Sequence, residues 1–516
     1  MVRMDKKTIE PGQSRLVENT VSLTVSGIFS VVFTLTQLGL LSRFMGGEEF
    51  GLFIALRGLH ILLATLILLG LPQVLMRFIP SYQGRGMRKK AYLLFLTSTG
   101  IVLFLGALLY SSADLWKGWI PSRLTESLIS RDIIFWLTLA SITLGLKLLL
   151  YGAFKGLRVM SAQMVLELSC LGLFTAYIFF TRNSLSAVSL FRALFVINFL
   201  VCLTGFPFYI SLSKRLIGKE IIKKDNIILP KLFPYWGNCL LLSLVALAFT
   251  DIDRFAMSSM LPVAMISVFH IASRINMFLK RFLGFPIIAL QPEVTRIYEE
   301  GRWGEFKRKI VLFTKGTFVA SLLMVAIVAI TGRDVILLIA GAGYGDAYTI
   351  LLILLPTVPV AAFIAPLLVT MKGLHYIKWA LLCDLIWMIV YFGGFPIFVS
   401  LLGLKGMAVA QLAASIAQML SAVLIARKKG FYGGIGKGVI RVIVIVAIII
   451  PAGISAATLW GLWVSLLSIA VFPFLCRFVF GQSGLFKPDD VEQIFSLIKF
   501  RWGKRIAGWF FQSEIV

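Results

Sequence analysis

Charged side chains are scarce in this sequence, and the residues of metal and disulfide chemistry are scarcer still. Charged residues make up 14% of the 516 positions, and there are three histidines and five cysteines. The cysteines all lie inside apolar runs without the spacing of metal ligands, so we expect neither a disulfide framework nor a metal site. The sequence also has no Walker loop, no paired acids in a soluble domain and no nucleophile beside a base. These absences argue against an enzyme and against a bound cofactor.

Apolar side chains are what the sequence has in abundance. They account for 59% of the residues, and the mean hydropathy is +0.92, which is too high for a water-soluble surface. The formal net charge is +26, but no soluble domain is present to carry a basic face, so we expect no nucleic-acid partner. The chain is therefore predicted to be a polytopic membrane protein.

Fourteen apolar stretches are long enough to cross a bilayer as helices. The first follows a polar segment and has no cleavage site, so we interpret it as a retained helix and not as a signal peptide. The predicted limits are 17–42, 50–76, 91–112, 133–154, 159–181, 187–213, 233–250, 262–285, 310–331, 346–371, 376–400, 404–426, 438–459 and 461–481. The predicted fold is all-α with 14 transmembrane helices.

The distribution of Lys and Arg between the loops predicts the orientation. Basic residues stay on the cytoplasmic side of short loops. They are numerous in every second loop, and the other loops hold only Arg43, Lys117, Arg123, Arg131, Arg182, Arg254, Arg333 and Lys405. We therefore expect a multi-pass protein of the cell (plasma or inner) membrane with both termini in the cytoplasm.

Several landmarks recur at an offset of 217 residues. Arg57 corresponds to Arg274, Lys155 with the two residues after it corresponds to Lys372 with the same two residues, and Glu167 corresponds to Asp384. This offset equals six predicted helices, an even number that preserves orientation. The sequence thus predicts two parallel six-helix repeats with a cleft between them, followed by two extra C-terminal helices.

The repeat defines the predicted domains. We expect an N-terminal bundle over 1–213, a cytoplasmic linker over 214–232, a C-terminal bundle over 233–429 and helices 13 and 14 over 437–481. The tail 482–516 has an amphipathic pattern and basic residues, so we expect it to lie on the inner leaflet. Packing against the cytoplasmic loops is the alternative.

Six cationic or imidazole side chains inside the predicted helices are candidates for binding an anion. A cation in the bilayer is costly, so each should face protein, water or an interface. Arg57 and His60 are three residues apart and His270 and Arg274 are four apart, so each pair shares a helical face. Snorkelling to the interface is the ordinary alternative. The candidates are Arg57, His60, Lys147, Arg192, His270 and Arg274.

A polar stripe on the first predicted helix adds hydrogen-bonding groups. Its residues are spaced by about four, and they are Ser22, Ser26, Ser30, Thr34 and Gln37. Such residues also serve simply to pack helices together. Taken with the cations, the stripe predicts a cationic, hydrogen-bonding cleft whose ligand is an anion with hydroxyls, such as a phosphorylated sugar carrier.

Three acids in or near the predicted helices are candidates for ion coupling. Glu167, Asp384 and Asp251 are the only candidates that we single out for H⁺ or Na⁺ binding, and the membrane potential is another possible energy source. They could equally neutralise nearby Lys or Arg as structural pairs.

One stretch resembles a known family. Leu41, Ser42, Arg43 and Phe44, followed by Gly46 to Leu52, is similar to the first external turn of polysaccharide-type flippases, and Arg77 to Pro80 and the pair Asp253, Arg254 resemble further stretches. The resemblance covers the first twelve predicted helices. It implies the multidrug, oligosaccharidyl-lipid and polysaccharide exporter superfamily, with two six-helix bundles in a V.

The resemblance also implies a function. Members of this branch move polyprenyl-pyrophosphate-linked oligosaccharides from the inner to the outer leaflet by alternating access, for surface glycan assembly. The implied partners are the lipid-linked glycan, membrane lipids and glycan polymerase or glycosyltransferase machinery. The alternatives are a flippase for the peptidoglycan precursor lipid, a cation-coupled drug or small-molecule antiporter, and a membrane scaffold that transports nothing.

Overall fold

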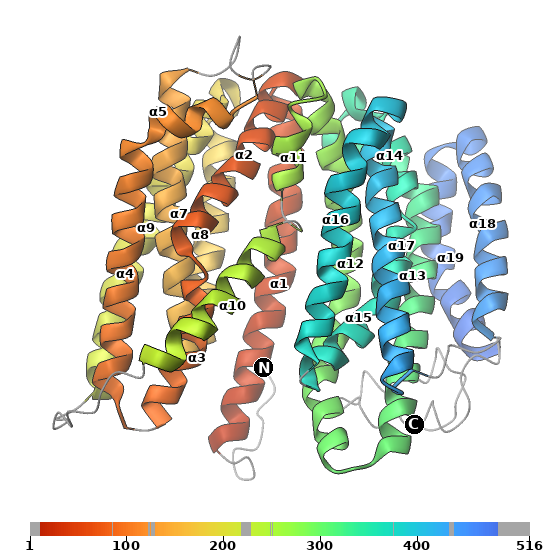
Figure 1. Cartoon of the computed structure of the whole chain (residues 1–516). Coiled ribbons are helices and arrows are strands. Elements are labelled where there is room, and N and C mark those ends of the chain that lie inside the picture. The colour runs from red at the N-terminus through yellow and green to blue at the C-terminus, as the bar shows by residue number, and fades with distance from the viewer. Residues whose placement is uncertain are drawn as a thin grey trace, which may run out of the picture. The chain divides into compact units, whose positions relative to one another are not determined.

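The computed structural model describes residues 11–84, 86–121, 124, 130–217, 229–247, 249, 251–374, 376–432 and 438–482. Every regular element in these residues is a helix (Figure 1). Eleven of the helices are long and apolar enough to cross a membrane, and three shorter apolar stretches also occur, Phe29–Phe44, Tyr235–Leu247 and Trp463–Arg477. The prediction of an all-α, polytopic membrane protein is confirmed. The count of 14 transmembrane helices stays a prediction, because three of the predicted spans contain only these shorter stretches.

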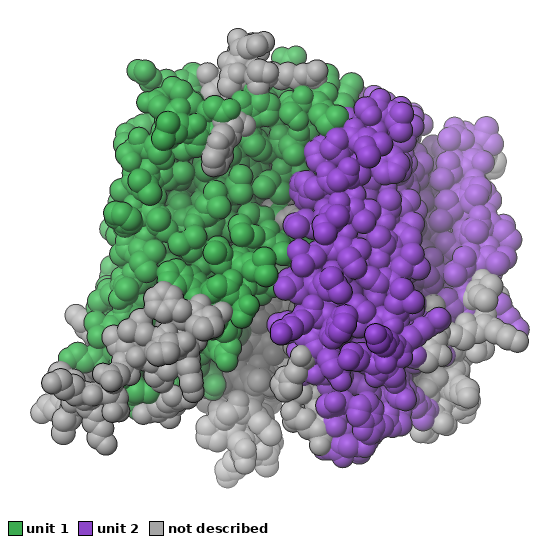
Figure 2. All heavy atoms as spheres, in the orientation of Figure 1, with its two compact units in different colours: residues 1–267 green, residues 268–516 purple. Residues whose placement is uncertain are grey.

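The chain divides into two compact units, Met1–Ser267 and Val268–Val516, which Figure 2 shows in separate colours. The boundary lies inside a helix, α12, and not in the linker 214–232. The helices α10 and α11, which precede α12, belong to unit 1 because they pack on α2 and α3. The domain limits expected from the repeat stay a prediction, as does the tail, whose residues beyond Gln482 lie outside the described part of the chain.

Unit 1 contains ten α-helices within its described residues and two short 3₁₀ turns, Lys117–Trp119 and Arg182–Ser184. The helices are α1 (Pro11–Phe44), α2 (Gly47–Leu68), α3 (Leu71–Gly84), α4 (Arg88–Ser111), α5 (Ala113–Trp116), α7 (Arg131–Gly156), α8 (Met160–Phe180), α9 (Ala187–Ile217), α10 (Leu229–Leu247) and α11 (Ile252–Met257). The helix α7 packs against α2, α3, α4 and α9, so it is the central helix of the unit.

The turn that resembles the flippase family also connects two distant helices. Glu49, in the first turn of α2, accepts a hydrogen bond from the backbone N–H of Ala187 at 3.0 Å. Ala187 is the first residue of α9, whose leading N–H groups have no partners within the helix. A carboxylate at this end satisfies one of those groups and interacts favourably with the helix dipole. The acid of the motif therefore fixes the start of α9 against α2.

We expected the second predicted span, 50–76, to be one helix, but it is not. It breaks into α2 and α3 because Leu69 and Gly70 both adopt a left-handed conformation, with φ of 47° and 75°. Pro72 then lies in the first turn of α3, where the missing N–H costs nothing. The break packs against α10: the indole N–H of Trp236 donates to the carbonyl of Leu69 at 2.6 Å. The two helices therefore take different directions within unit 1, as Figure 1 shows.

Unit 2 contains seven further α-helices and most of α12 within its described residues. They are α12 (Val263–Glu299, which begins in unit 1), α13 (Trp303–Ala340), α14 (Ala347–Leu354), α15 (Thr357–Gly373), α16 (Ile377–Leu402), α17 (Leu404–Lys428), α18 (Gly438–Trp460) and α19 (Leu462–Gln482), with a 3₁₀ turn at Ala342–Tyr344. A cluster of buried side chains that includes Phe306, Phe363 and Phe431 packs α13 and α15 against the segment after α17.

Two helices of unit 2 are longer than a bilayer requires. α12 has 37 residues and α13 has 38, which gives each a length of about 55 Å against about 30 Å of hydrocarbon. The helix α12 continues without interruption through Gly284 and Pro286, which correspond to Gly70 and Pro72 of the α2–α3 break at an offset of 214 residues instead of 217. The two halves of the predicted duplication therefore differ here.

Candidate functional site

A cavity of about 530 Å³ lies inside unit 1, between α2, α3, α7, α8 and α10. Its size is within the range of pockets that hold small-molecule ligands. Close packing of α3 against α7 defines the edge of the cavity. A Cβ at Gly152 of α7 would lie 2.8 Å from Pro72, and one at Gly156 would lie 2.8 Å from the carbonyl oxygen of Leu75. The ends of α3 and α7 are thus in direct contact, and the space opens beside this contact.

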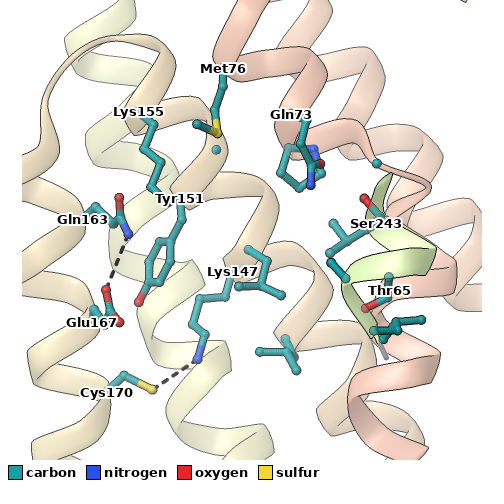
Figure 3. Close-up of a pocket in the computed structure, with 18 of the residues that line it drawn as sticks. Thr65, Gln73, Met76, Lys147, Tyr151, Lys155, Gln163, Glu167, Cys170 and Ser243 are labelled. Atoms are coloured by element: carbon teal, nitrogen blue, oxygen red, sulfur yellow. Dashed lines mark hydrogen bonds between the residues drawn. The ribbon is translucent and has the colours of Figure 1, made fainter. Parts of the chain in front are cut away.

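One wall of the cavity is formed by α7 and α8 and carries all of its charges. Lys147, Tyr151 and Lys155 follow one another at intervals of four on α7, so they share one helical face. The helix α8 adds Gln163 and Glu167 to the same wall. The amide of Gln163 donates a long hydrogen bond of 3.5 Å to the carboxylate of Glu167. Figure 3 shows these side chains converging on the same space.

Lys147 is held in place by neutral groups. Its ammonium donates to the amide oxygen of Asn198 at 2.7 Å and to the sulfur of Cys170 at 3.4 Å. Asn198 is 1% exposed, so its position is fixed by the packing of α9. Within the described residues neither Lys147 nor Lys155 forms a salt bridge with a carboxylate, and Glu167 forms none with a cation. The cavity therefore holds two positive charges and one negative charge that are not paired in direct contacts.

The opposite wall is polar but uncharged. It carries Thr65 from α2, Gln73 from α3 and Ser243 from α10, which Figure 3 shows facing the charged wall. The hydroxyls of Thr65 and Ser243 donate to carbonyls of their own helices at 2.8 and 2.9 Å, so their oxygens still have lone pairs available.

Three polar atoms of residues that line this cavity are buried and have no hydrogen-bond partner within the described residues. They are the side-chain carbonyl oxygens of Gln73 and Gln163 and the hydroxyl of Tyr151. Buried polar groups without partners are rare in folded proteins and cost free energy. These atoms have almost no accessible surface, so a ligand in the cavity does not reach them in this conformation.

The structure places Arg57 and His60 in two different environments, although they share a helix. Arg57 is partly exposed, and its Nε lies 3.8 Å from one carboxylate oxygen of Asp251, whose other oxygen lies 3.5 Å from Arg254. His60 is buried in the core of unit 1, where its ring nitrogen lies 3.0 Å from the hydroxyl of Ser141. Neither residue lines the cavity. Asp251 is thus in an ion-pair cluster, the structural alternative that we named for the acids.

His270 and Arg274 contact each other on α12, as their spacing predicts. The Nε of Arg274 donates to the Nε2 of His270 at 3.3 Å, and both side chains are buried. A neighbouring residue, Asn276, donates to the hydroxyl of Thr357 at 3.0 Å and so connects α12 with α15. These contacts lie within unit 2.

The remaining candidates are dispersed. Arg192 is exposed, and its guanidinium carbon lies 5.0 Å from the ring centre of Trp136. Gln37 donates to the hydroxyl of Thr175 at 3.0 Å, and Thr34 donates to the carbonyl of Ser30, which is the packing role that we weighed for the stripe. The side chains of Ser22 and Ser26 lie outside the described residues. Asp384 accepts from Gln418 at 2.9 Å in unit 2.

Two of the predicted site residues, Lys147 and Glu167, therefore line one cavity, and sequence reasoning missed their neighbours. Gln73, Tyr151 and Gln163 are neutral, so the search for costly charges in the bilayer passed over them. Lys155 served only as a landmark of the repeat. A signal was present, because Lys147, Tyr151 and Lys155 share one face of α7. Within the described residues no group of three or more possible metal ligands occurs, and the five cysteines are unpaired.

Comparison with known structures shows which fold this is. A lipid II flippase, MurJ, in an inward closed conformation has a TM-score of 0.63 at 14% identity and covers 86% of this chain and 97% of its own. An inward-facing multidrug resistance MATE family transporter of the MOP superfamily also has a TM-score of 0.63, at 18% identity over 77% of this chain and 94% of its own.

A third structure is of the same kind. The Vibrio cholerae MATE transporter VcmN in its bent form has a TM-score of 0.55 at 15% identity, over 80% of this chain and 97% of its own. The chain thus shares the fold of these structures, one of which is a transporter of the MOP superfamily, as the resemblance implied.

Sequence comparison gives a consistent result at the level of the family. No curated protein sequence matches the chain. A family model described as polysaccharide biosynthesis protein matches residues 16–298, which is more than half of the chain. This chain therefore belongs to the polysaccharide biosynthesis protein family, with the fold of the MOP superfamily.

Proposed function

We propose that this protein is a flippase that moves a polyprenyl-(pyro)phosphate-linked oligosaccharide from the cytoplasmic to the outer leaflet of the cell membrane. The observation that carries the proposal is the cavity of unit 1, where Lys147 and Lys155 have no carboxylate in contact within the described residues. Membership of the polysaccharide biosynthesis protein family supports a glycan as the cargo.

The cavity favours an anionic group for an electrostatic reason. Lys147 and Lys155 are partly buried, and a cation that is partly removed from water is stabilised by an opposite charge or by several hydrogen bonds. Lys147 has only two neutral partners, and one carboxylate, that of Glu167, is present for two lysines. A phosphate supplies the missing negative charge and accepts several hydrogen bonds at once. The same balance of charge disfavours an organic cation and so argues against a drug antiporter.

Arg57 and Arg274 remain proposed ligands of the substrate's phosphate, with a more restricted role. Arg57 already has a carboxylate nearby, that of Asp251, and Arg274 is buried beside His270. Both arginines therefore have neighbours that a phosphate would have to replace or join. We give the principal role to the lysines of the cavity for this reason.

The transport cycle that we propose is alternating access with both termini in the cytoplasm. The headgroup would enter from the cytoplasmic side while the prenyl chain stays in the lipid. Glu167 is the proposed site of ion coupling in unit 1, because it lines the cavity and is in contact with no cation there within the described residues. Asp384 and Asp251 are weaker candidates, since Gln418 and two arginines respectively are already beside them. Glycosyltransferases or a polymerase would supply and consume the lipid-linked glycan.

The test is a flipping assay in liposomes with a lipid-linked oligosaccharide. We expect the double substitution Lys147→Ala and Lys155→Ala to slow flipping about tenfold or more, because each lysine contributes a charge-assisted hydrogen bond to the phosphate. Lys117→Ala is the control, because that lysine is half-exposed and pairs with Asp114 of the short helix α5, away from the cavity. Undiminished flipping by the double variant, with normal folding, would refute the assignment of the cavity.

The same assay separates the alternatives. A peptidoglycan precursor lipid that moves faster than the oligosaccharide lipid would identify the protein as a flippase for that precursor. A scaffold would move neither lipid above the rate of protein-free liposomes.

A further inference from the structure

Basic side chains gather at one end of unit 2, where α15 and α17 end and α16 begins. The three helices pack against one another, and Figure 1 shows the start of α16 and the end of α17 at the same end of the unit. Four of the basic side chains are exposed and the fifth, which directly follows α17, is partly buried. We call this set the basic end of unit 2, and it consists of Lys372, Lys378, Arg427, Lys428 and Lys429.

The charge of the basic end is not balanced by acids of the surrounding helices. From the start of α14 to the residue after α17 the sequence has one acidic residue, Asp384. It lies six residues beyond Lys378, about 9 Å along α16, and it accepts a hydrogen bond from Gln418. Near the start of α13, Glu300 and Glu305 have basic partners of their own. Within the described residues none of the five cations of the basic end forms a salt bridge, so their mutual repulsion favours an anion from outside the chain.

Two aromatic rings hold one of these cations in position. The ammonium of Lys429 lies 5.1 Å from the ring centre of Tyr376 and 5.5 Å from that of Trp379, distances at which a cation is attracted to the face of a ring. The ring of Tyr376 stacks in turn on Phe431, with 6.5 Å between the ring centres and an angle of 14° between the planes. Tyr376 and Trp379 also pack against the buried cluster that contains Phe431. The rings orient Lys429 but bring no negative charge, so its charge remains available to a ligand.

An exposed apolar strip leads away from the basic end along α17. Leu420, Leu424 and Lys428 follow one another at intervals of four, so they share one face of the helix. The two leucines are 56% and 66% exposed, on a helix that is long and apolar enough to cross a membrane. Tryptophan and tyrosine beside lysines are typical of the level of the lipid headgroups. The surface therefore offers apolar contacts for an acyl chain directly beside a set of cations.

We propose that the basic end of unit 2 binds the phosphate headgroup of an anionic phospholipid, whose acyl chains lie along Leu420 and Leu424. The lipid supplies the negative charge that these helices lack, and basic surfaces between transmembrane helices are typical sites for such headgroups. A soluble anion would contact the cations alone and leave the apolar strip uncovered. The residues of this site are distinct from those of the cavity in unit 1, so the inference does not depend on which cargo is transported. The bound lipid would stabilise the packing of α15, α16 and α17.

The experiment measures the binding of two phospholipids to the purified full-length protein in an uncharged detergent. Phosphatidylglycerol carries a net negative charge and phosphatidylcholine carries none, and native mass spectrometry resolves each bound lipid during a titration. We expect the tightest site to prefer phosphatidylglycerol by at least about tenfold. The triple variant Lys378→Ala, Lys428→Ala and Lys429→Ala should weaken phosphatidylglycerol binding at this site by at least about tenfold, because each cation near a headgroup contributes a factor of about five.

The matched control is Lys405→Ala, because Lys405 is an exposed lysine at the opposite end of α17, and this variant should bind phosphatidylglycerol as the unaltered protein does. Arginine at the three substituted positions keeps the charge, so the triple arginine variant should also retain the affinity. Inorganic phosphate should displace the lipid no more than chloride does at equal ionic strength.

Three results would overturn the inference. The first is undiminished phosphatidylglycerol binding by the triple alanine variant, or an equal loss in the triple arginine variant. The second is displacement of the lipid by inorganic phosphate beyond the effect of chloride. The third is equal affinity of the unaltered protein for the two lipids, as expected of a surface that docks a soluble acidic protein. None of these results bears on the flippase proposal, because no measurement here involves lipid movement.

Discussion

At the scale of the residue, the most informative contrast is between arginines and lysines. The arginines repeated at positions 57 and 274 are the landmarks of the duplication, yet both have close neighbours inside their own units. Lys147 and Lys155, the second of which is also a landmark of the repeat, line a cavity without a paired carboxylate within the described residues. Repetition of a cation in the sequence therefore does not by itself identify a ligand site, whereas the lack of a paired carboxylate favours one.

Arg57 and Asp251 should behave as a coupled pair in stability. Their contact at 3.8 Å connects α2 with the residue before α11, and the arginine side chain is 32% exposed. We expect Arg57→Ala and Asp251→Asn each to lower the stability in detergent, with a coupling energy of about 1 kcal/mol in a double-mutant cycle, because partial exposure weakens the pair. Thermal unfolding of the two single variants and the double variant measures this.

Arg192 provides the comparison for this cycle. It is an exposed cation of the same unit that contacts the ring of Trp136. Arg192→Ala combined with Asp251→Asn should give additive effects. A purely substrate-binding Arg57 would also give additive stability effects with Asp251, and its loss would reduce flipping alone.

The sequence predicted charged residues better than neutral ones at this scale. Lys147 and Glu167 were identified because ionisable groups inside a membrane are costly and so require an explanation. Gln73, Tyr151 and Gln163 give no such signal, because their cost depends on whether a partner lies nearby, and only the fold decides that. His60 illustrates the limit of helical spacing: it shares a face with Arg57, but its ring contacts Ser141 in the core. Helical spacing alone does not distinguish a cavity from a core.

At the scale of the element, the break between α2 and α3 positions one wall of the cavity. Gly70 and Pro72 both line the cavity, and Gln73 follows them in the first turn of α3. The sequence showed glycine and proline here but not the outcome, because a proline in the first turn of a helix is compatible with either a bend or a new helix. The left-handed conformation of Leu69 completes the break, and no residue type announces it. The corresponding glycine and proline in α12 leave that helix unbroken.

Gly70→Ala should destabilise the protein more than the same change at Gly86. Both glycines have a positive φ, 75° and 74°, so the conformational cost of a Cβ is similar, about 1 kcal/mol. At Gly70 the added Cβ would also lie 2.7 Å from the backbone of Cys239 in α10, whereas at Gly86 nothing lies within 4 Å. The difference in thermal unfolding between the two variants therefore reports the close approach of α10 to the break. Equal losses would mean that α10 can move away without cost.

At the scale of the whole molecule, the sequence specified the class of protein and the family but not which parts of the chain pack together. Hydropathy predicted the helices, since their length is set by the bilayer. The repeat predicted a division near the linker 214–232, but α10 and α11 pack on α2 and α3, so the compact unit extends to Ser267. Periodicity along a chain carries no information about which neighbour a helix selects. The assignment of the two termini to the cytoplasm stays a prediction, because it rests on the charges of the loops.

The orientation can be tested with two variants that each carry one introduced cysteine at a position of similar accessibility. The side chains of Lys117 and Arg302 are 49% and 47% exposed, and the five native cysteines are buried, so a reagent should label only an introduced thiol. The positive-inside rule places Lys117 outside and Arg302, which lies among several basic residues, in the cytoplasm. A membrane-impermeant maleimide should therefore label Lys117→Cys in intact cells and Arg302→Cys only after the membrane is opened. The reverse labelling pattern would mean that the protein has the opposite orientation in the bilayer. The lipid-linked glycan would then meet Lys155, at the end of α7, from the wrong side for export.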